Sequence, residues 1–177
     1  MGLFLQTVIL PNCKESLIKT AVEQVEERTN IGLIAADCLY KELNDGVNIL
    51  LNRHCFGYEE LAKELSLCIT QPVLLLYIYD DDFWGYFFYE NGNELDRFNP
   101  MPDYFEDVSE EERESFSGNS KIISKYFNVN EEDIKNYLNI SVLGDIHNFD
   151  DNKKKKYGGK YYKYRYYKRK YYGKEYK

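Results

Sequence analysis

Three consecutive aspartates, Asp80, Asp81 and Asp82, are the first residues of this sequence whose type and spacing could do chemistry. They lie between an apolar run and an aromatic run, so we expect them in a loop between two strands. Carboxylates that converge from a loop bind hard cations such as Ca²⁺ or Mg²⁺, and Asp96 and Asp103 could add further ligands. However, the spacing D-x-[DN]-x-[DN]-G is absent, and aspartate favours solvated turns. We therefore expect a turn here, with no metal and no cofactor.

Nucleophilic catalysis has little support in the sequence. A thiol nucleophile needs a base within hydrogen-bonding reach, and His54 is adjacent to Cys55, but neighbouring strand residues point to opposite faces. His147 is the only other histidine. The sequence contains no G-x-S-x-G, P-loop or G-x-G-x-x-G motif, and its four cysteines lack the paired spacing of a zinc site. We expect buried free thiols and a protein that is not an enzyme.

The last 25 residues, 153–177, are rich in lysine and tyrosine. They hold 12 of the 23 Lys and Arg, nine of the 18 Tyr and one acid, a net charge of +11, whereas residues 1–152 carry −18. Lysine and arginine neutralise phosphates while tyrosine stacks on bases, so this composition favours polyanion binding. Oxidative cross-linking in an assembly, or folding back onto the acidic body, are the alternatives. The candidate residues are Lys160, Tyr161, Tyr162, Arg165, Lys168 and Arg169.

The hydrophobic pattern predicts the elements that must position these groups. Periodic apolar residues predict an amphipathic helix after Asn12, capped reciprocally with Glu15, and a second helix after Gly57. Turn residues 44–46 predict a hairpin. We expect strands at 3–10, 31–40, 47–51 and 73–79, and short helices after Ser109, around residues 122–127 and after Asn130.

The clearest turn is Asn91-Gly92, which predicts a hairpin from Phe83 to Phe98 because both turn residues need positive φ. In that register Phe88 faces Leu95, Tyr86 faces Arg97 and Trp84 faces Asn99. Both faces of the hairpin would then carry aromatic rings. One face meets the core, and we expect the C-terminal helices, rather than a partner, to cover the other.

The order strand, helix, strand, strand, helix, strand predicts an α+β fold of the ferredoxin-like, split βαβ type, with an antiparallel sheet extended by the hairpin and followed by short helices. We divide the chain into an acidic globular domain, residues 1–150, and a basic low-complexity tail, residues 151–177. No stretch approaches the ~20 apolar residues needed to cross a bilayer, and no basic region precedes the N-terminal apolar residues. We expect a cytoplasmic location, with a spore coat as the alternative.

Two segments of the chain resemble known kinds of protein. The segment from Asp80 to Phe105, D-D-D-F-W-G-Y-F-F-Y-E-N-G-N-E-L-D-R-F-N-P-M-P-D-Y-F, resembles a family of small acidic bacterial proteins without an established activity. This resemblance implies a bacterial protein and supplies no catalytic residue. The tail from Lys153 resembles the tyrosine- and lysine-rich segments of bacterial spore coat proteins, which become cross-linked in the coat.

The sequence as a whole favours a non-enzymatic protein-binding module, immunity-like or regulatory, that binds a basic partner through an acidic and aromatic surface. The alternative is a structural coat or assembly protein whose tail is cross-linked or binds nucleic acid. The candidate partner-binding residues are Asp80, Asp81, Asp82, Trp84, Tyr86, Arg97, Asp103 and Tyr104.

Overall fold

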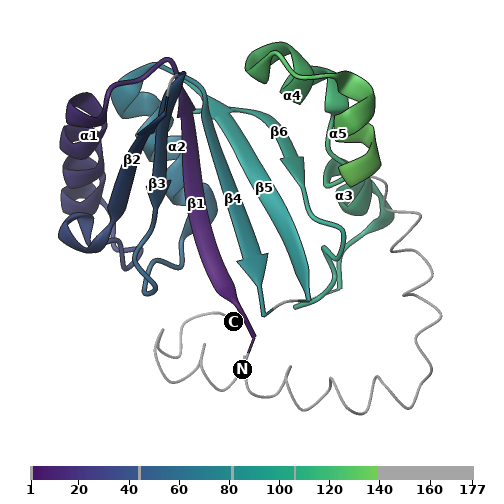
Figure 1. Cartoon of the computed structure of the whole chain (residues 1–177). Helices are drawn as coiled ribbons and strands as arrows, with labels where there is room; N and C mark the ends of the chain where they lie inside the picture. The colour runs from purple at the N-terminus through teal and green to yellow at the C-terminus, as the bar shows by residue number, and fades with distance from the viewer. Residues whose placement is uncertain (1, 44, 81, 106, 139–177) are drawn as a thin grey trace.

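The structure, a computed structural model, describes residues 2–43, 45–80, 82–105 and 107–138. One open six-stranded sheet, in which every neighbouring pair is antiparallel, has the strand order β2-β3-β1-β4-β5-β6 (Figure 1). The strands are β1 (Phe4–Pro11), β2 (Leu39–Leu43), β3 (Gly46–Leu50), β4 (Val73–Tyr79), β5 (Phe83–Glu90) and β6 (Asn93–Phe98). The helices are α1 (Glu15–Arg28), η1 (Ala35–Asp37, a 3₁₀ turn), α2 (Tyr58–Ile69), α3 (Glu110–Ser115), α4 (Ser120–Phe127) and α5 (Glu131–Tyr137). The α+β class is confirmed, and the ferredoxin-like assignment stays a prediction.

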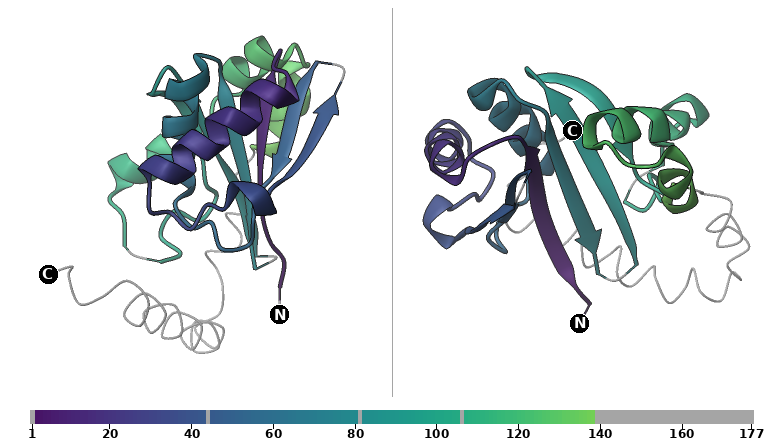
Figure 2. Two further views of the ribbon diagram at one scale, coloured as in Figure 1. Left: turned by 90° about the vertical axis from the view of Figure 1, so that its left-hand side faces the viewer. Right: turned by 45° about the horizontal axis from the view of Figure 1, so that its top comes forward.

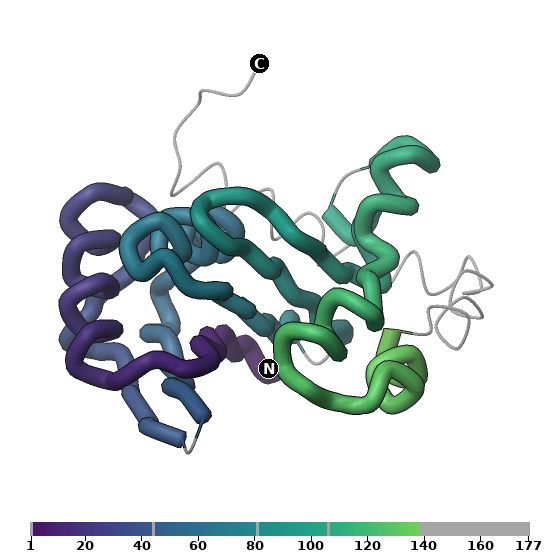
Figure 3. The backbone as a smooth tube through the Cα atoms, turned by 90° about the horizontal axis from the view of Figure 1, so that it is seen from above, coloured from purple at the N-terminus to yellow at the C-terminus, as the bar shows by residue number. Residues whose placement is uncertain are grey.

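Helices α1 and α2 pack on one face of the sheet and enclose the larger core. Helices α4 and α5 lie on the opposite face, displaced towards β6, as the views from the side and from above show (Figures 2 and 3). Fully burying one Val, Leu or Ile side chain stabilises the fold by ~1.5–3 kcal/mol, so the larger core dominates stability. Its fully buried members include Val8, Leu10, Ile18, Val22, Val25, Val47, Ile49, Leu61, Leu65 and Leu75.

Two local predictions in the first third of the chain are wrong. Asn12 does not cap α1: it lies in the left-handed region at φ 56°, and Lys14 precedes the helix without a side-chain cap. The predicted strand at 31–40 is confined to its last residues, in β2. The preceding loop is held by the buried side chain of Asn52, which accepts a hydrogen bond from Ile34 N (2.9 Å) and donates to Gly32 O (2.8 Å) in place of a strand partner.

The hairpin of β5 and β6 forms around Asn91-Gly92, with φ of 50° and 74°, as predicted. Its predicted register is wrong beyond the turn, because a β-bulge shifts it between Phe88 and Tyr89. Phe88 pairs with Asp96, not Leu95, and the extra residue reverses which side chains of β6 share a face. Arg97 therefore faces the α2 side, opposite to the prediction.

Helices α4 and α5 cover the second aromatic face of the hairpin, as predicted. A smaller core forms there around Phe88 and Phe98, both fully buried, together with Ile123 of α4. Helices α3 and α5 begin where the sequence predicts them: Ser109, before α3, accepts a hydrogen bond from Glu112 N (3.1 Å), and Asn130, before α5, accepts one from Glu132 N (2.9 Å). The aromatic residues of this face therefore contribute to packing.

Candidate partner-binding surface

Four of the predicted partner-binding residues gather at one end of the sheet, where β4 ends and β5 begins. We call this surface the acidic–aromatic end and define it by Phe4, Tyr79, Asp80, Asp82, Phe83, Asp103, Tyr104 and Phe105. Tyr79 is its centre, because its ring lies 4.9–5.5 Å from the rings of four other members. Aromatic pairs at such distances each add ~0.5–1.5 kcal/mol beyond the burial of their area. The packed rings therefore give this end a rigid apolar base.

Asp82 and Tyr104, 22 residues apart, are joined directly. The hydroxyl of Tyr104 donates a hydrogen bond of 2.7 Å to Oδ2 of Asp82. Burial, followed by this hydrogen bond, raises the pKa of Tyr104, so its hydroxyl keeps its proton and remains a donor. The contact fixes the loop after β6 against the start of β5 and orients the carboxylate at the rim of the aromatic base.

Asp80 lies in the turn between β4 and β5 at φ 51°, a left-handed conformation that aspartate tolerates better than most residues. Its Oδ1 accepts a hydrogen bond of 3.0 Å from the backbone of Gly2, which joins the start of the chain to this end. The backbone of Asp82 closes the turn by donating to Tyr79 O (2.8 Å). The predicted turn is confirmed at these two residues, and Asp81 lies outside the described residues.

Asp103 is held from a different element. Its Oδ2 lies 3.2 Å from a guanidinium nitrogen of Arg113 in α3. Both side chains are about one-third exposed, so this ion pair contributes at most ~1 kcal/mol. The pair places a third carboxylate, half-buried like Asp80 and Asp82, beside Tyr104 in sequence.

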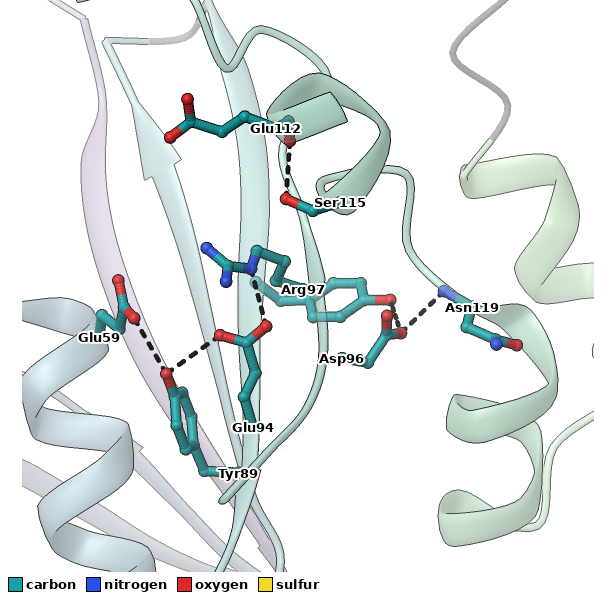
Figure 4. A network of polar contacts seen from close by, with 9 residues as sticks. Glu59, Tyr89, Glu94, Asp96, Arg97, Glu112, Ser115 and Asn119 are labelled. Carbon is teal, nitrogen blue, oxygen red and sulfur yellow. Dashed lines mark hydrogen bonds and ion pairs between the residues drawn. The ribbon is translucent and has the colours of Figure 1, made fainter. Parts of the chain in front are cut away.

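Arg97 lies apart from the acidic–aromatic end. Its Nε is 2.7 Å from Oε1 of Glu94, and its guanidinium lies 4.9 Å from the ring centre of Phe116. Glu94 also accepts a hydrogen bond of 3.1 Å from the hydroxyl of Tyr89. The same hydroxyl lies 3.0 Å from Glu59 of α2, so these polar contacts link the hairpin to that helix (Figure 4). Arg97 thus takes part in a contact between the hairpin and α2, and not in the surface predicted from the sequence.

Trp84 and Tyr86 lie on the other face of the sheet, in or beside the smaller core. Tyr86 is 3% exposed, and its hydroxyl donates to Oδ2 of Asp96 (2.6 Å), which also accepts from the backbone of Asn119 (2.8 Å). Trp84 is half-buried against Phe98, at 4.9 Å between ring centres. Tyr86 is therefore out of reach of a partner while the smaller core is packed.

The other groups with possible chemistry are poorly placed for it. Cys13, Cys38 and Cys55 are buried free thiols, as predicted, and Cys68 is a half-buried one. Burial raises the pKa of Cys55 to about 12, which opposes formation of the nucleophilic thiolate. Within residues 2–43, 45–80, 82–105 and 107–138, no three His, Cys, Asp or Glu side chains come together as a metal site.

Several members of the acidic–aromatic end were not predicted from the sequence. Phe4 and Phe105 join it through ring contacts, and Arg113, which is not a member, holds Asp103 through the ion pair. Phe105 carries a usable signal, since it directly follows two predicted residues. Phe4 and Arg113 are distant in sequence, and their contacts depend on strand order and on the packing of α3.

Comparisons of the chain with protein-family models, with curated proteins and with solved structures found no match. The two resemblances drawn from the sequence stay predictions. The candidate tail residues, Lys160 to Arg169, lie outside the described residues. In the part of the chain that the structure describes, no helix has the length and apolar character needed to cross a membrane.

Proposed function

We propose that this protein is a non-enzymatic binding module whose acidic–aromatic end binds a basic protein partner. The observation that carries the proposal is the convergence of Asp80, Asp82, Asp103 and Tyr104, which the sequence places in two separate segments. Packed rings supply an apolar base, and carboxylates surround it. Interfaces are commonly built in this way, with an aromatic centre and a charged rim.

The charge of the chain supports a basic partner. Residues 1–152 carry −18, so the acidic–aromatic end lies within a field that attracts cations over a Debye length of ~8–10 Å. Such a field raises the rate of encounter with a basic protein and repels acidic ones. A protein of this kind would act by binding its partner, as immunity-like and regulatory proteins do, without catalysing a reaction.

Two features support a non-enzymatic role. The thiol beside His54 is buried with a raised pKa, and the aspartates of the end are engaged in the turn, in Tyr104 and in Arg113. Carboxylates tied to neighbouring donors are suited to presenting fixed charge rather than to transferring protons.

The experiment is a capture assay with the full-length protein in a nuclease-treated native lysate, followed by mass spectrometry. The test variant replaces three carboxylates of the end, Asp80→Asn, Asp82→Asn and Asp103→Asn. The control makes the same charge change on exposed positions of α1 and α2, Glu23→Gln, Glu27→Gln and Glu60→Gln. A basic protein retained by the wild type and the control but lost from the test variant supports the proposal, and equal retention by all three contradicts it.

We also propose a ferredoxin-like unit made of β1 to β4 with α1 and α2. The order β4-β1-β3-β2, with all pairs antiparallel and a helix in each of the two crossovers, supports this assignment. With this assignment, β5 and β6 extend the sheet beyond β4, and the acidic–aromatic end lies at the junction of the unit and its extension.

The alternative function, a coat or assembly protein, depends on residues 153–177 and gains no support from the described geometry. It predicts dityrosine fluorescence and an insoluble protein fraction. If the tail instead binds nucleic acid, the affinity must fall steeply with salt.

A further inference from the structure

One half of the sheet face opposite α1 and α2 is aliphatic and exposed. Leu39 is 66% exposed, Leu43 45% and Leu50 38%. Of the described helices, α4 and α5 lie on this side, towards β6, and none lies over β2 and β3 (Figure 1). We call this surface the open half-face and define it by the side chains that β1, β2, β3 and the end of β4 direct to this side: Leu5, Thr7, Ile9, Leu39, Lys41, Leu43, Asn48, Leu50, Leu76 and Ile78.

The open half-face is continuous and nearly free of charge. Leu39 pairs with Leu50 across the strands, and Leu50 pairs with Thr7, whose hydroxyl donates to Ile49 O (2.9 Å). Lys41 is the one charged member, and it lies on the edge strand, where its ammonium can reach water while its stem lies beside the leucines. Contiguous exposed apolar area of this kind marks an interaction surface.

We infer that this protein forms a two-fold dimer in which the open half-faces of two copies pack against each other. The surface is complementary to itself, because each copy offers aliphatic side chains and few polar groups, and a two-fold contact closes after two copies. Two sheets that pack face to face lie ~10 Å apart, with their strand directions within about 30° of each other. The inference does not depend on the proposed function, which uses the end of the sheet rather than its face.

The acidic charge of the protein is placed so that it does not oppose this contact. The glutamates of α1 and α2 lie on the other face of the sheet: Glu15, Glu23, Glu26, Glu27, Glu59, Glu60 and Glu64. In the dimer, the gap between the sheets and one helix diameter on each side separate the glutamates of the two copies by ~30 Å. This distance is more than three Debye lengths of ~8 Å, so their repulsion is largely screened.

A dimer through the edge of the sheet is less favourable than a dimer through its face. Strand β2 is the last strand on its side of the sheet. A two-fold antiparallel pair that sets Leu39 opposite Leu43 of a second copy also sets Lys41 opposite Lys41. Like charges directly opposite each other destabilise a strand pair, and lysine on an edge strand opposes edge-to-edge pairing.

The size of the open half-face predicts a weak dimer. Four strands at ~4.8 Å and five residues at ~3.4 Å give a flat footprint of ~330 Å² on each copy. Stable complexes bury ~800 Å² of accessible surface on each partner, and weak, transient ones bury less. We therefore expect a Kd in the micromolar range and a mixture of monomer and dimer.

Sedimentation equilibrium of the full-length protein tests the inference, at protein concentrations up to millimolar. A salt concentration of ~1 M, with a Debye length of ~3 Å, suppresses association between oppositely charged segments. The test variant is Leu39→Gln, Leu43→Gln. The control, Leu17→Gln, Leu67→Gln, makes the same change at leucines of α1 and α2 that are 54% and 48% exposed.

We expect the wild type and the control to dimerise with Kd values within about twofold of each other. The test variant should dimerise at least about 30-fold more weakly, because its two substitutions remove four buried leucines from each dimer. A wild type that stays monomeric at millimolar concentration, or equal Kd values for the two variants, would overturn the inference.

Photo-crosslinking locates the contact independently of these variants. The crosslinking residue p-benzoylphenylalanine replaces Leu43 in one full-length protein and Leu17 in the other. We expect a covalent dimer from position 43, joined to a peptide within residues 4–11 or 39–50 of the second copy, and none from position 17. A product at monomer mass alone would mean that the chain itself covers the open half-face. That result, no product from position 43, or equal yields of dimer from the two positions would each contradict the inference.

Discussion

At the scale of single residues, Asp96 connects the hairpin to the helices that cover it. Its carboxylate accepts hydrogen bonds from the hydroxyl of Tyr86 and from the backbone of Asn119, just before α4. Burial is the largest influence on this group and raises the pKa of Asp96, while the two hydrogen bonds act in the opposite direction. The native protein therefore holds a proton at this position more tightly than the unfolded chain does.

This shift predicts the pH dependence of stability. The contribution of Asp96 to the free energy of unfolding falls as the pH rises from ~3.9, the pKa of an aspartate in the unfolded chain, through its raised native pKa. The wild type should thus lose stability relative to Asp96→Asn as the pH rises, measured by urea unfolding between pH ~3 and ~6. Exposed Asp107→Asn is the control. A stability difference that is independent of pH, or that changes in the opposite direction, would refute this role for burial.

At the scale of elements, the turn of the β5–β6 hairpin combines strain-free geometry with a tertiary contact. Gly92 has φ of 74°, and its amide donates a hydrogen bond of 2.8 Å to Ser66 of α2. A left-handed conformation costs a residue with a Cβ ~1–2 kcal/mol. The turn thus fixes the hairpin against α2 as well as reversing the chain.

Gly92→Ala should lower the free energy of unfolding by ~1–2 kcal/mol, because the left-handed backbone becomes strained and the new Cβ would lie 2.7 Å from Leu67. Urea unfolding followed by circular dichroism measures the change. The adjacent exposed position gives the control: Asn93→Ala should change stability by less than ~0.5 kcal/mol. Equal effects at the two positions would count against strain as the cause.

The helical cover of the hairpin gives a second prediction at this scale. Ile123 is 7% exposed and packs in the smaller core, so Ile123→Ala should cost ~2–4 kcal/mol. Val129, 43% exposed just after α4, is the control, and Val129→Ala should cost less than ~0.5 kcal/mol. Thermal or urea unfolding measures both. A loss below ~1 kcal/mol for Ile123→Ala would mean that α4 contributes little to the stability of the sheet.

Local signals in the sequence predicted many elements correctly. Asn91-Gly92 marked the turn because positive φ is a property of those two residues, and Ser109 and Asn130 marked helix starts because capping depends on nearby backbone groups. The bulge beside Phe88 was not predictable, because it depends on which side chains of β6 pack under α4. The segment before β2 was predicted as a strand because it is apolar. It is a loop, because the hydrogen bonds that hold it come from Asn52, which is distant in sequence.

The residues of the candidate site also fall into some that the sequence predicted and some that only the fold brings together. Asp82 and Tyr104 were chosen for their types, and the structure joins them, but Arg97 was assigned to the wrong face of the hairpin through the missed bulge. The partners Gly2 and Arg113 come from separate elements, so only the strand order and the position of α3 bring them to the surface.

At the scale of the whole molecule, charge and apolar surface have different locations. Acidic groups and packed rings meet at one end of the sheet, whereas β2 and β3 expose the aliphatic side chains of Leu39, Leu43 and Leu50 on the face opposite α1 and α2. We propose that the first surface binds a basic partner.

The most direct test of the proposed function is the affinity of the captured partner for the variant Asp80→Asn, Asp82→Asn, Asp103→Asn. Three half-buried carboxylates that each contribute ~0.5 kcal/mol to binding correspond to about a tenfold weaker Kd when they are neutralised, and the effect should shrink at high salt. The control variant Glu23→Gln, Glu27→Gln, Glu60→Gln should bind within about twofold of the wild type, because those positions lie outside the contact. Equal weakening by the two variants would show that net charge alone drives association, and would contradict a binding site at the acidic–aromatic end.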